Sequence, residues 1–381
     1  DVARVAGARA AGARAAARTE VVVPVRAGLD VGGGYHSPQV EVDVRLNTNE
    51  SPVPPPPGWL DALRDALGSL DLHRYPDRRA SALRCALADV HGVAPEQVFC
   101  ANGSNEVLQC LLLAYGGAGR TVVTFEPTYA LHTHIARITG TGVAAGERRP
   151  DFTLDLDEAR RLLASARPTV TFLCSPNNPT GLADPPEVIR EVVARAPGLV
   201  VVDEAYGQFS PWSALTLLGE GGGEASRRLA VVRTFSKTWA MAGARLGYLV
   251  APEPVVAAVE AVVLPYHLDA VKQLAGRLAL SFGAEMQDRV AMLVGERARL
   301  AAGLQRLRVE TWPSDANFIL FRPLAREGRE VWQGLLDRSV LVRDCSSWPR
   351  LAGCLRVTVG TPAEDDRFLV ALAEVLEGPA R

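Results

Sequence analysis

The sequence predicts an α/β protein with a mostly parallel central sheet in a large domain, followed by a smaller α+β domain. At 381 residues, with 48% hydrophobic and 22% charged residues, the chain exceeds one ordinary domain and can bury a large core. Short uninterrupted apolar runs alternate with helical patterns along most of it. That alternation is typical of a mainly parallel sheet with helices on both faces.

The composition excludes several classes of partner. A net charge of -2 offers no basic surface for nucleic acid or anionic lipid. No apolar run reaches the ~18 residues that a membrane-spanning helix needs. The six cysteines form no C-x-x-C pair, and several lie in apolar stretches, which favours reduced thiols in a cytoplasmic protein. We therefore expect small-molecule partners, no nucleic acid and no membrane.

The N-terminal part divides into two segments. Residues 1–20 place arginines in an alanine background without the apolar core of a secretory signal, which predicts a disordered leader; a targeting role is the alternative. Residues 21–58 are expected to form an arm that joins the small domain. The arm ends in "VPPPPG", a rigid extended connector, because each proline fixes φ and removes a hydrogen-bond donor.

The large domain is expected over residues 59–270. Its helical patterns cover 59–69, 79–91, 104–115, 129–138 and 186–195. Its apolar strands are "VFCAN", "TVVTFEP", "TVTFLCSP", "LVVVDEAY", "LAVVRTFS" and "RLGYLVAP".

The small C-terminal domain is expected over residues 271–381. It begins with a long helical pattern at 271–307 and continues with the strands "ANFILFRP", "VLVRD" and "CLRVTVG" between helices at 329–338 and 363–376. Because a long helix rather than a flexible linker joins the two domains, we expect them to pack together and share a cleft.

Polar motifs follow four of the predicted strands of the large domain. They are "CANGSNE", "SPNNPTG", "DEAY" and "TFSK". Ligands of doubly wound sheets bind at the carboxyl ends of the strands. The four motifs therefore predict one binding site at that edge.

A phosphate site is indicated by two of these loops. Gly103 opens a helix whose first turn, with Ser104 and Asn105, presents free backbone N–H groups to an anion, although ordinary helix capping is the alternative. Ser236 and Arg245 add a hydroxyl and a guanidinium that can bind the oxygens of one phosphate.

The remaining polar residues indicate an aldehyde cofactor. Such a cofactor with a phosphate tail needs a lysine for a Schiff base, an acid that keeps its ring nitrogen protonated, and donors near its phenolic oxygen. Lys237, Asp203, Tyr206 and Asn178 supply these groups. Taken singly, Lys237 reads as a solvated charge and Asp203 as a solvated strand-end acid; together they predict a catalytic site.

Motifs along the chain carry a family resemblance. They are "RLNTNESP", "RYPD", "EPTY", "SPNNPTG", "DEAY", "TFSKTWAMAGARLGY", "LPYHLDAVKQ", "ANFILFRP", "LVRD" and "LRVTVGTPAED". From "PVRAGLD" to the C-terminus the sequence resembles the fold-type I pyridoxal 5'-phosphate (PLP) aminotransferases, and within them the histidinol-phosphate aminotransferases. It departs from the pattern at Asn105, where the family often has an acid, and in "NESP", which replaces "NENP".

The resemblance implies a role for each matching residue. Lys237 would bind the cofactor covalently and carry protons, and Asp203 would pair with its ring nitrogen. Asn178 and Tyr206 would hydrogen-bond its phenolic oxygen, while Tyr129 would stack on its ring or, alternatively, serve as a core aromatic. Residues implied to hold the phosphate are Ser104, Asn105, Ser236 and Arg245.

The resemblance also implies a homodimer with a shared active site, because Tyr75 in "RYPD" would reach the phosphate in the neighbouring subunit. Substrate contacts would fall on Tyr35, Asn49, Arg343 and Arg356. Arg356 lies within a strand and needs an anionic partner, which a substrate carboxylate would supply; a structural salt bridge is the alternative for both arginines. His132 and His134 do not predict a metal site, because residues two apart on a helix face different sides.

The implied activity is transfer of an amino group between histidinol phosphate and 2-oxoglutarate, a step of histidine biosynthesis. An aromatic amino acid aminotransferase or a PLP-dependent decarboxylase of a phosphorylated amino acid would keep the same cofactor residues. A PLP-binding sensor is the alternative that is not an enzyme. It would need an added basic winged-helix domain, and the N-terminal stretch of about 45 residues is too short and too poor in apolar residues to form one.

Overall fold

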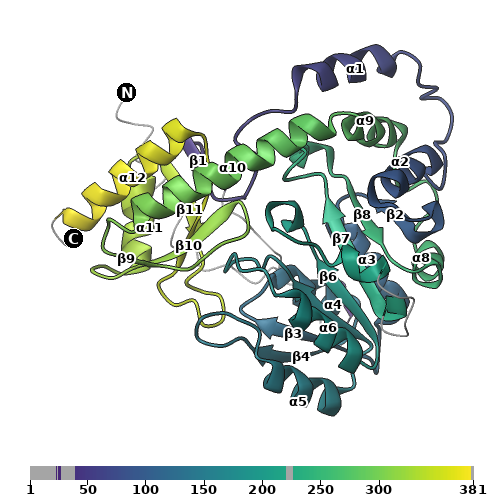
Figure 1. Ribbon diagram of the computed structural model, residues 1–381, viewed down its shortest axis with the longest axis horizontal. Helices are drawn as coiled ribbons and strands as arrows, with labels where there is room; N and C mark the ends of the chain where they lie inside the picture. The colour runs from purple at the N-terminus through teal and green to yellow at the C-terminus, as the bar shows by residue number, and fades with distance from the viewer. Residues whose placement is uncertain (1–22, 24, 27–38, 220–225, 379–381) are drawn as a thin grey trace. The chain divides into compact units, whose positions relative to one another are not determined.

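The computed structural model describes residues 23, 25–26, 39–219 and 226–378 (Figure 1). The expectations for residues 1–20 and for Tyr35 concern residues outside these ranges. The chain divides into two compact units, residues 1–34 and 35–381, and every helix and strand named here belongs to the second. No helix within the described ranges is long and apolar enough to cross a bilayer.

The centre of the larger lobe is a mostly parallel sheet, as predicted, but it has seven strands, because β4 was not among the six expected ones (Figure 1). Its order is β2-β8-β7-β6-β5-β3-β4, and every pairing is parallel except the two made by β8. Its strands are β2 (Val98–Ala101), β3 (Thr121–Glu126), β4 (Gly142–Glu147), β5 (Val170–Cys174), β6 (Leu199–Asp203), β7 (Leu229–Thr234) and β8 (Gly247–Val250).

Both faces of this sheet are covered by helices. Along β6, Leu199 and Val201 pack into one apolar cluster with α3, α4 and α8, whereas Val200 and Val202 pack into another with α5 and α6. Successive side chains of a strand point to opposite faces, so a strand buried on both sides reads as an unbroken apolar run. The helices of this lobe are α1 (Pro57–Leu67), α2 (Ser81–His91), α3 (Ser104–Tyr115), α4 (Ala130–Ile138), α5 (Leu156–Ala166), α6 (Pro186–Arg195), α7 (Leu215–Gly219), α8 (Glu253–Glu260) and α9 (Ala270–Leu280), with 3₁₀ turns at Pro95–Gln97, Gly207–Phe209, Ser226–Arg228 and Ala242–Ala244.

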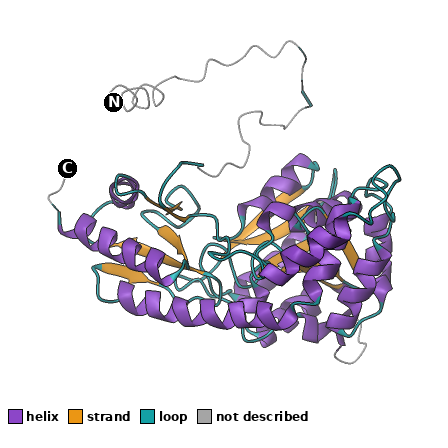
Figure 2. Ribbon diagram, turned by 90° about the horizontal axis from the view of Figure 1, so that it is seen from above, coloured by secondary structure: helices purple, strands orange, loops and turns teal. Residues whose placement is uncertain are grey.

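The smaller lobe is built on a five-stranded sheet in the order β1-β11-β12-β10-β9. Figure 2 shows strands of this lobe (orange) beside its helices (purple). Its first strand comes from the segment before the proline run and pairs in parallel with β11, Val44 opposite Val340. The elements of this lobe are β1 (Val44–Leu46), α10 (Gly283–Leu304), β9 (Val309–Thr311), β10 (Phe318–Pro323), α11 (Gly328–Leu336), β11 (Val340–Asp344), β12 (Leu355–Thr358) and α12 (Pro362–Glu377).

The helical pattern at 271–307 forms two helices rather than one. The helix is interrupted at Ser281 and Phe282, where Phe282 has φ -105° and ψ 36°. The two pieces pack against different partners, α9 on α1 and α2 of the large lobe and α10 on α12 and β10 of the small lobe. Helical periodicity continues across the break, so the pattern alone does not reveal it.

Candidate active site

One cavity of about 350 Å³ gathers the predicted site residues. Its lining includes every predicted site residue except Tyr35, which lies outside the described residues, and Tyr75. The predicted residues that line it are Asn49, Ser104, Asn105, Tyr129, Asn178, Asp203, Tyr206, Ser236, Lys237, Arg245, Arg343 and Arg356. The polar loops after β2, β5, β6 and β7 therefore converge as the strand order requires.

Lys237 follows the end of β7 and projects into this cavity. Its Nζ donates a hydrogen bond of 2.9 Å to the carbonyl oxygen of Thr48 and lies 5.8 Å from the ring centroid of Tyr206. Burial lowers the pKa of Lys237 to about 7, and the Arg356 guanidinium contributes to the decrease. Near pH 7, Lys237 is therefore a neutral amine in a large fraction of the molecules.

Asp203 is the last residue of β6 and is 1% exposed. Its Oδ1 accepts a hydrogen bond of 3.0 Å from the Ala205 amide, and its Oδ2 lies 3.0 Å from Nε2 of His132. The His132 ring is stacked on Phe172 with centroids 4.6 Å apart. His132 is a site residue that the sequence analysis missed, because it considered this histidine only as a metal ligand.

The amide of Asn49 brings the small lobe into contact with Tyr206. Its Nδ2 donates to the Tyr206 hydroxyl at 2.9 Å. The Thr358 hydroxyl on β12 accepts from the Asn49 backbone N–H at 3.0 Å and donates to its Oδ1 at 2.9 Å. A strand of the small lobe therefore orients a residue that faces the large lobe.

The loop before α3 and the residues after β7 form a cradle for an anion. Arg245 Nη1 lies 3.3 Å from Ser236 Oγ. Gly103, with φ +80°, precedes Ser104, the first residue of α3, and a Cβ on Gly103 would lie 2.8 Å from Arg245 Nη2. Only glycine both adopts this backbone conformation readily and leaves room for the guanidinium at the helix N-terminus.

Tyr129 lies between this cradle and His132. Its hydroxyl is 3.5 Å from Asn105 Oδ1, and its ring meets the His132 ring edge-on, with centroids 5.4 Å apart. The aromatic ring thus borders the cavity rather than being enclosed in the core.

Arg356 lies within β12, directly opposite Arg343 on β11. Its Nη1 donates to Oδ1 of Asn178, and its Nη2 donates to the carbonyl oxygen of Asn47 at 2.9 Å. Its Nε is buried without a hydrogen-bond partner among the described residues. These partners are uncharged, unlike the carboxylate that a structural salt bridge would supply. The guanidinium of Arg343 lies 5.5 Å from the ring centroid of Trp348.

Tyr75 does not line the cavity. Its side chain is 80% exposed and is stacked on Tyr266, with ring centroids 4.5 Å apart. The predicted contact of Tyr75 with a neighbouring subunit stays a prediction.

The polar groups that line the cavity match the chemistry of a flat aldehyde that carries a phosphate. The cavity holds a partly neutral amine, a buried carboxylate and a cradle of hydroxyl, guanidinium and helix N-terminus that a side chain at Gly103 would obstruct. On a mostly parallel sheet this combination defines a PLP-dependent enzyme of fold type I.

Comparison with known proteins places the chain within this class. A family model described as "Aminotransferase class I and II" matches residues 41–372. The chain belongs to this aminotransferase family, and it is a PLP-dependent enzyme.

Individual relatives extend over most of the chain. A histidinol-phosphate aminotransferase of Frankia casuarinae is 46% identical, covering 93% of this chain and 91% of its own. That of Streptomyces avermitilis is also 46% identical, covering 93% and 96%. The crystal structure of histidinol-phosphate aminotransferase from Sinorhizobium meliloti in complex with pyridoxal-5'-phosphate has a TM-score of 0.80 at 25% identity, covering 88% of this chain and 91% of that one.

The lowered pKa of Lys237 predicts a pH-dependent stability of the cofactor-free protein. Between pH 7 and 10.5 the unfolded chain retains a proton on Lys237 that the folded chain has released. The free energy of unfolding contributed by this residue therefore rises with pH, by at most about 1.4 kcal/mol per pH unit. Urea unfolding of the wild type and of Lys237→Met at pH 7, 8 and 9 measures it. A stability difference between the two that stays constant over this range contradicts the prediction.

Proposed function

We propose that the protein is a histidinol-phosphate:2-oxoglutarate aminotransferase that acts in histidine biosynthesis. The observation that carries the proposal is the pair of guanidiniums, Arg343 opposite Arg356, in the lining of a cavity that also holds Lys237. Two arginines at one end of the site suit substrates that carry carboxylate or phosphate groups. The histidinol-phosphate aminotransferases that are 46% identical over 93% of the chain support the choice of substrate.

The cofactor residues have distinct positions in this proposal. Ser104, Asn105, Ser236 and Arg245 would hold the phosphate of PLP. Asp203, held by His132 and the Ala205 amide, would keep a proton at the ring nitrogen. Asn178 and Tyr206 would bind the phenolic oxygen, and Tyr129 would pack on the ring.

When bound, PLP supplies an aldehyde that receives the amino group and a ring that withdraws electrons from the substrate Cα. The chain supplies the proton transfer. Lys237 Nζ, with a pKa of about 7, can accept a proton from the substrate Cα and release it again at neutral pH. Arg356 and Arg343 would orient the donor and then the 2-oxo acid acceptor by their anionic groups.

A homodimer with a shared active site is part of the proposal. Tyr75 is far more exposed than a tyrosine that serves a monomeric core, and Leu72 and Leu264, neighbours in sequence of Tyr75 and Tyr266, are 71% and 75% exposed. Exposed apolar side chains of this kind support a contact surface for a second copy. We also propose a cytoplasmic location, which the free thiols of all six cysteines support.

The substrate assignment predicts a preference that can be measured with the purified protein. With 2-oxoglutarate as acceptor, we expect kcat/KM for histidinol phosphate to exceed that for phenylalanine by about tenfold or more, because the phosphate of histidinol phosphate offers the guanidiniums more charge and more acceptor oxygens than the single carboxylate of phenylalanine. Faster turnover of phenylalanine would favour an aromatic aminotransferase, and release of CO₂ a decarboxylase. PLP binding without half-transamination of glutamate would indicate a sensor.

The phosphate cradle predicts a selective effect of Gly103→Ala. The new Cβ would displace the Arg245 guanidinium, and loss of one charge-assisted hydrogen bond of about 1.5–3 kcal/mol should raise the Kd for PLP about 10- to 100-fold. Absorbance titration of the cofactor-free chain measures this. Gly92→Ala is the matched control, since Gly92 has φ +64° but a Cβ added there would meet nothing within 4 Å. Equal Kd values for the two variants would argue against the cradle.

The shared site predicts complementation between two defective chains. Lys237→Met removes the reacting amine, and Tyr75→Ala removes the side chain proposed to act in the other subunit. After the two purified variants are unfolded together and refolded, we expect activity above the mean of the separately refolded variants, because a hybrid dimer contains one intact site. Activity no higher than that mean would place Tyr75 outside the neighbouring site.

A further inference from the structure

The loop between β5 and α6 carries Asn178 and is closed by its own hydrogen bonds. The backbone N–H of Asn177 donates to the Leu182 carbonyl oxygen at 2.7 Å, and the backbone N–H of Asp184 donates to Ser175 Oγ at 2.9 Å. The loop is therefore a compact unit whose position depends on what anchors it.

The side chain of Asn177 gives the loop one anchor. Its Nδ2 lies 2.9 Å from the Pro127 carbonyl oxygen and 2.8 Å from Thr180 Oγ1, and its Oδ1 accepts from Thr128 Oγ1 at 2.9 Å. This anchor holds the loop to the segment after β3. It leaves the far end of the loop, at Asp184, to be fixed separately.

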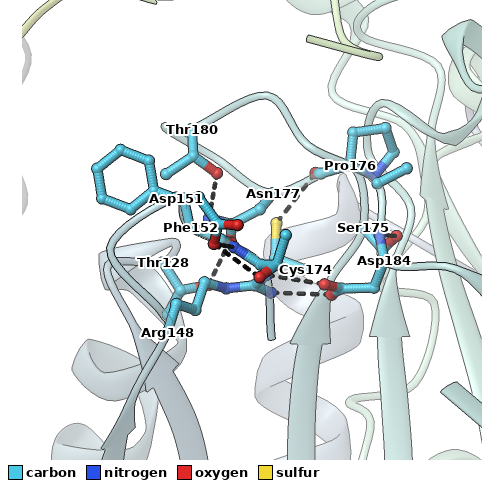
Figure 3. A network of polar contacts seen from close by, with 12 residues as sticks. Thr128, Arg148, Asp151, Phe152, Cys174, Ser175, Pro176, Asn177, Thr180 and Asp184 are labelled. Carbon is cyan, nitrogen blue, oxygen red and sulfur yellow. Dashed lines mark hydrogen bonds and ion pairs between the residues drawn. The ribbon is translucent and has the colours of Figure 1, made fainter. Parts of the chain in front are cut away.

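Arg148 fixes that end through a buried ion pair (Figure 3). Its two terminal nitrogens donate to the two carboxylate oxygens of Asp184 at 2.8 and 2.9 Å, and Nη1 also donates to the Phe152 carbonyl oxygen at 3.2 Å. Both side chains of the pair are at most 2% exposed. A planar two-pronged contact of this kind restricts orientation as well as distance.

The small lobe contacts the same loop from the other side. The Asp315 amide donates to the Gly181 carbonyl oxygen at 2.8 Å, and the Asp315 carboxylate accepts from the Ala183 amide at 3.1 Å. Arg350, also in the small lobe, donates to the carbonyl oxygen of Arg148. The ion pair and the small lobe thus both fix the loop, and Arg350 links the two.

Given the proposed function, we propose that the Arg148–Asp184 pair is a positioning device: it fixes the loop so that Asn178 meets both the phenolic oxygen of the cofactor and the guanidinium of Arg356. Asn178 Oδ1 accepts from Arg356 Nη1, so a displaced loop would alter the orientation of the arginine that is proposed to bind the anionic groups of the donor and of the 2-oxo acid. Neither member of the pair lines the active-site cavity.

A positioning role can be separated from a contribution to stability. Replacement of a buried ion pair by apolar residues of similar volume is often neutral for folding, whereas removal of one partner leaves an uncompensated charge. The double substitution Arg148→Met/Asp184→Leu therefore removes the two-pronged contact while keeping the site filled. Arg148→Lys keeps the positive charge but cannot make the two parallel hydrogen bonds that the guanidinium makes to Asp184.

The test uses the PLP-loaded protein. For the double variant we expect an unfolding temperature near that of the wild type, a higher KM for the 2-oxo acid, and a fall in kcat/KM of about 10- to 100-fold, the scale of a misplaced binding group. We also expect a shifted pH midpoint of the visible absorption band of the bound cofactor. Asn178→Ala should shift that midpoint in the same direction, and combination with the double substitution should add little, because both act through one contact.

Two outcomes would overturn the proposal. One is a double variant whose KM for the 2-oxo acid and whose pH midpoint of the absorption band both equal those of the wild type. The other is a combined variant in which the midpoint shifts of the double substitution and of Asn178→Ala add fully. Should the double variant not fold, Arg148→Lys is judged by the same criteria. The control is Arg161→Lys, in which the lost two-pronged contact belongs to a pair with Glu158 on the surface of α5, and it should change nothing. The comparison uses whichever amine the wild type turns over, so a wrong substrate assignment leaves it intact.

Discussion

The active site depends on a lysine amine that is buried in a cavity lined also by guanidinium groups. Lys237 Nζ has an uncharged carbonyl oxygen, that of Thr48, as its hydrogen-bond acceptor, and burial together with Arg356 lowers its pKa to about 7. The same desolvation makes the guanidinium of Arg356, whose hydrogen-bond partners on Asn178 and Asn47 are uncharged, favourable for an anionic ligand. A site of this kind favours ligands with phosphate and carboxylate groups, which are the groups of the proposed cofactor and substrates.

The parallel sheet brings the charged side chains of the site together, because its parallel strands end at one edge. β5, β6 and β7 are neighbours, and Cys174 and Asp203, the last residues of β5 and β6, lie in register with Val232, two residues before the end of β7. Loops that leave these strands must enter the same region, so the lysine and the acid line the same cavity. Burial of the strands on both faces gives the rigidity that the site requires.

The sequence predicted most strands of the large sheet and the strand-end residues of the cavity because both are encoded locally. Other residues of the cavity were expected only from the family resemblance, namely Asn49, Tyr129, Arg343 and Arg356. An unbroken apolar run such as "LVVVD" identifies a doubly covered strand, and the polar residue that ends it identifies the site edge. His132 was missed because its partner Asp203 is 71 positions away and nothing in the helix around it indicates the contact. The break between α9 and α10 was missed for a similar reason, since it arises from packing on two lobes.

The two lobes supply different residues of the site, and this explains which part of the function is harder to infer from the sequence. The lysine, the acid and the phosphate cradle belong to the large lobe, whereas Arg343 and Arg356 belong to strands of the small lobe, and Thr358 of that lobe orients Asn49. Cofactor chemistry therefore follows from strand-end motifs of one sheet. The proposed substrate contacts depend on how the two sheets are held together, and a contact such as that of Arg356 with Asn178, between residues 178 positions apart, cannot be read from a linear pattern.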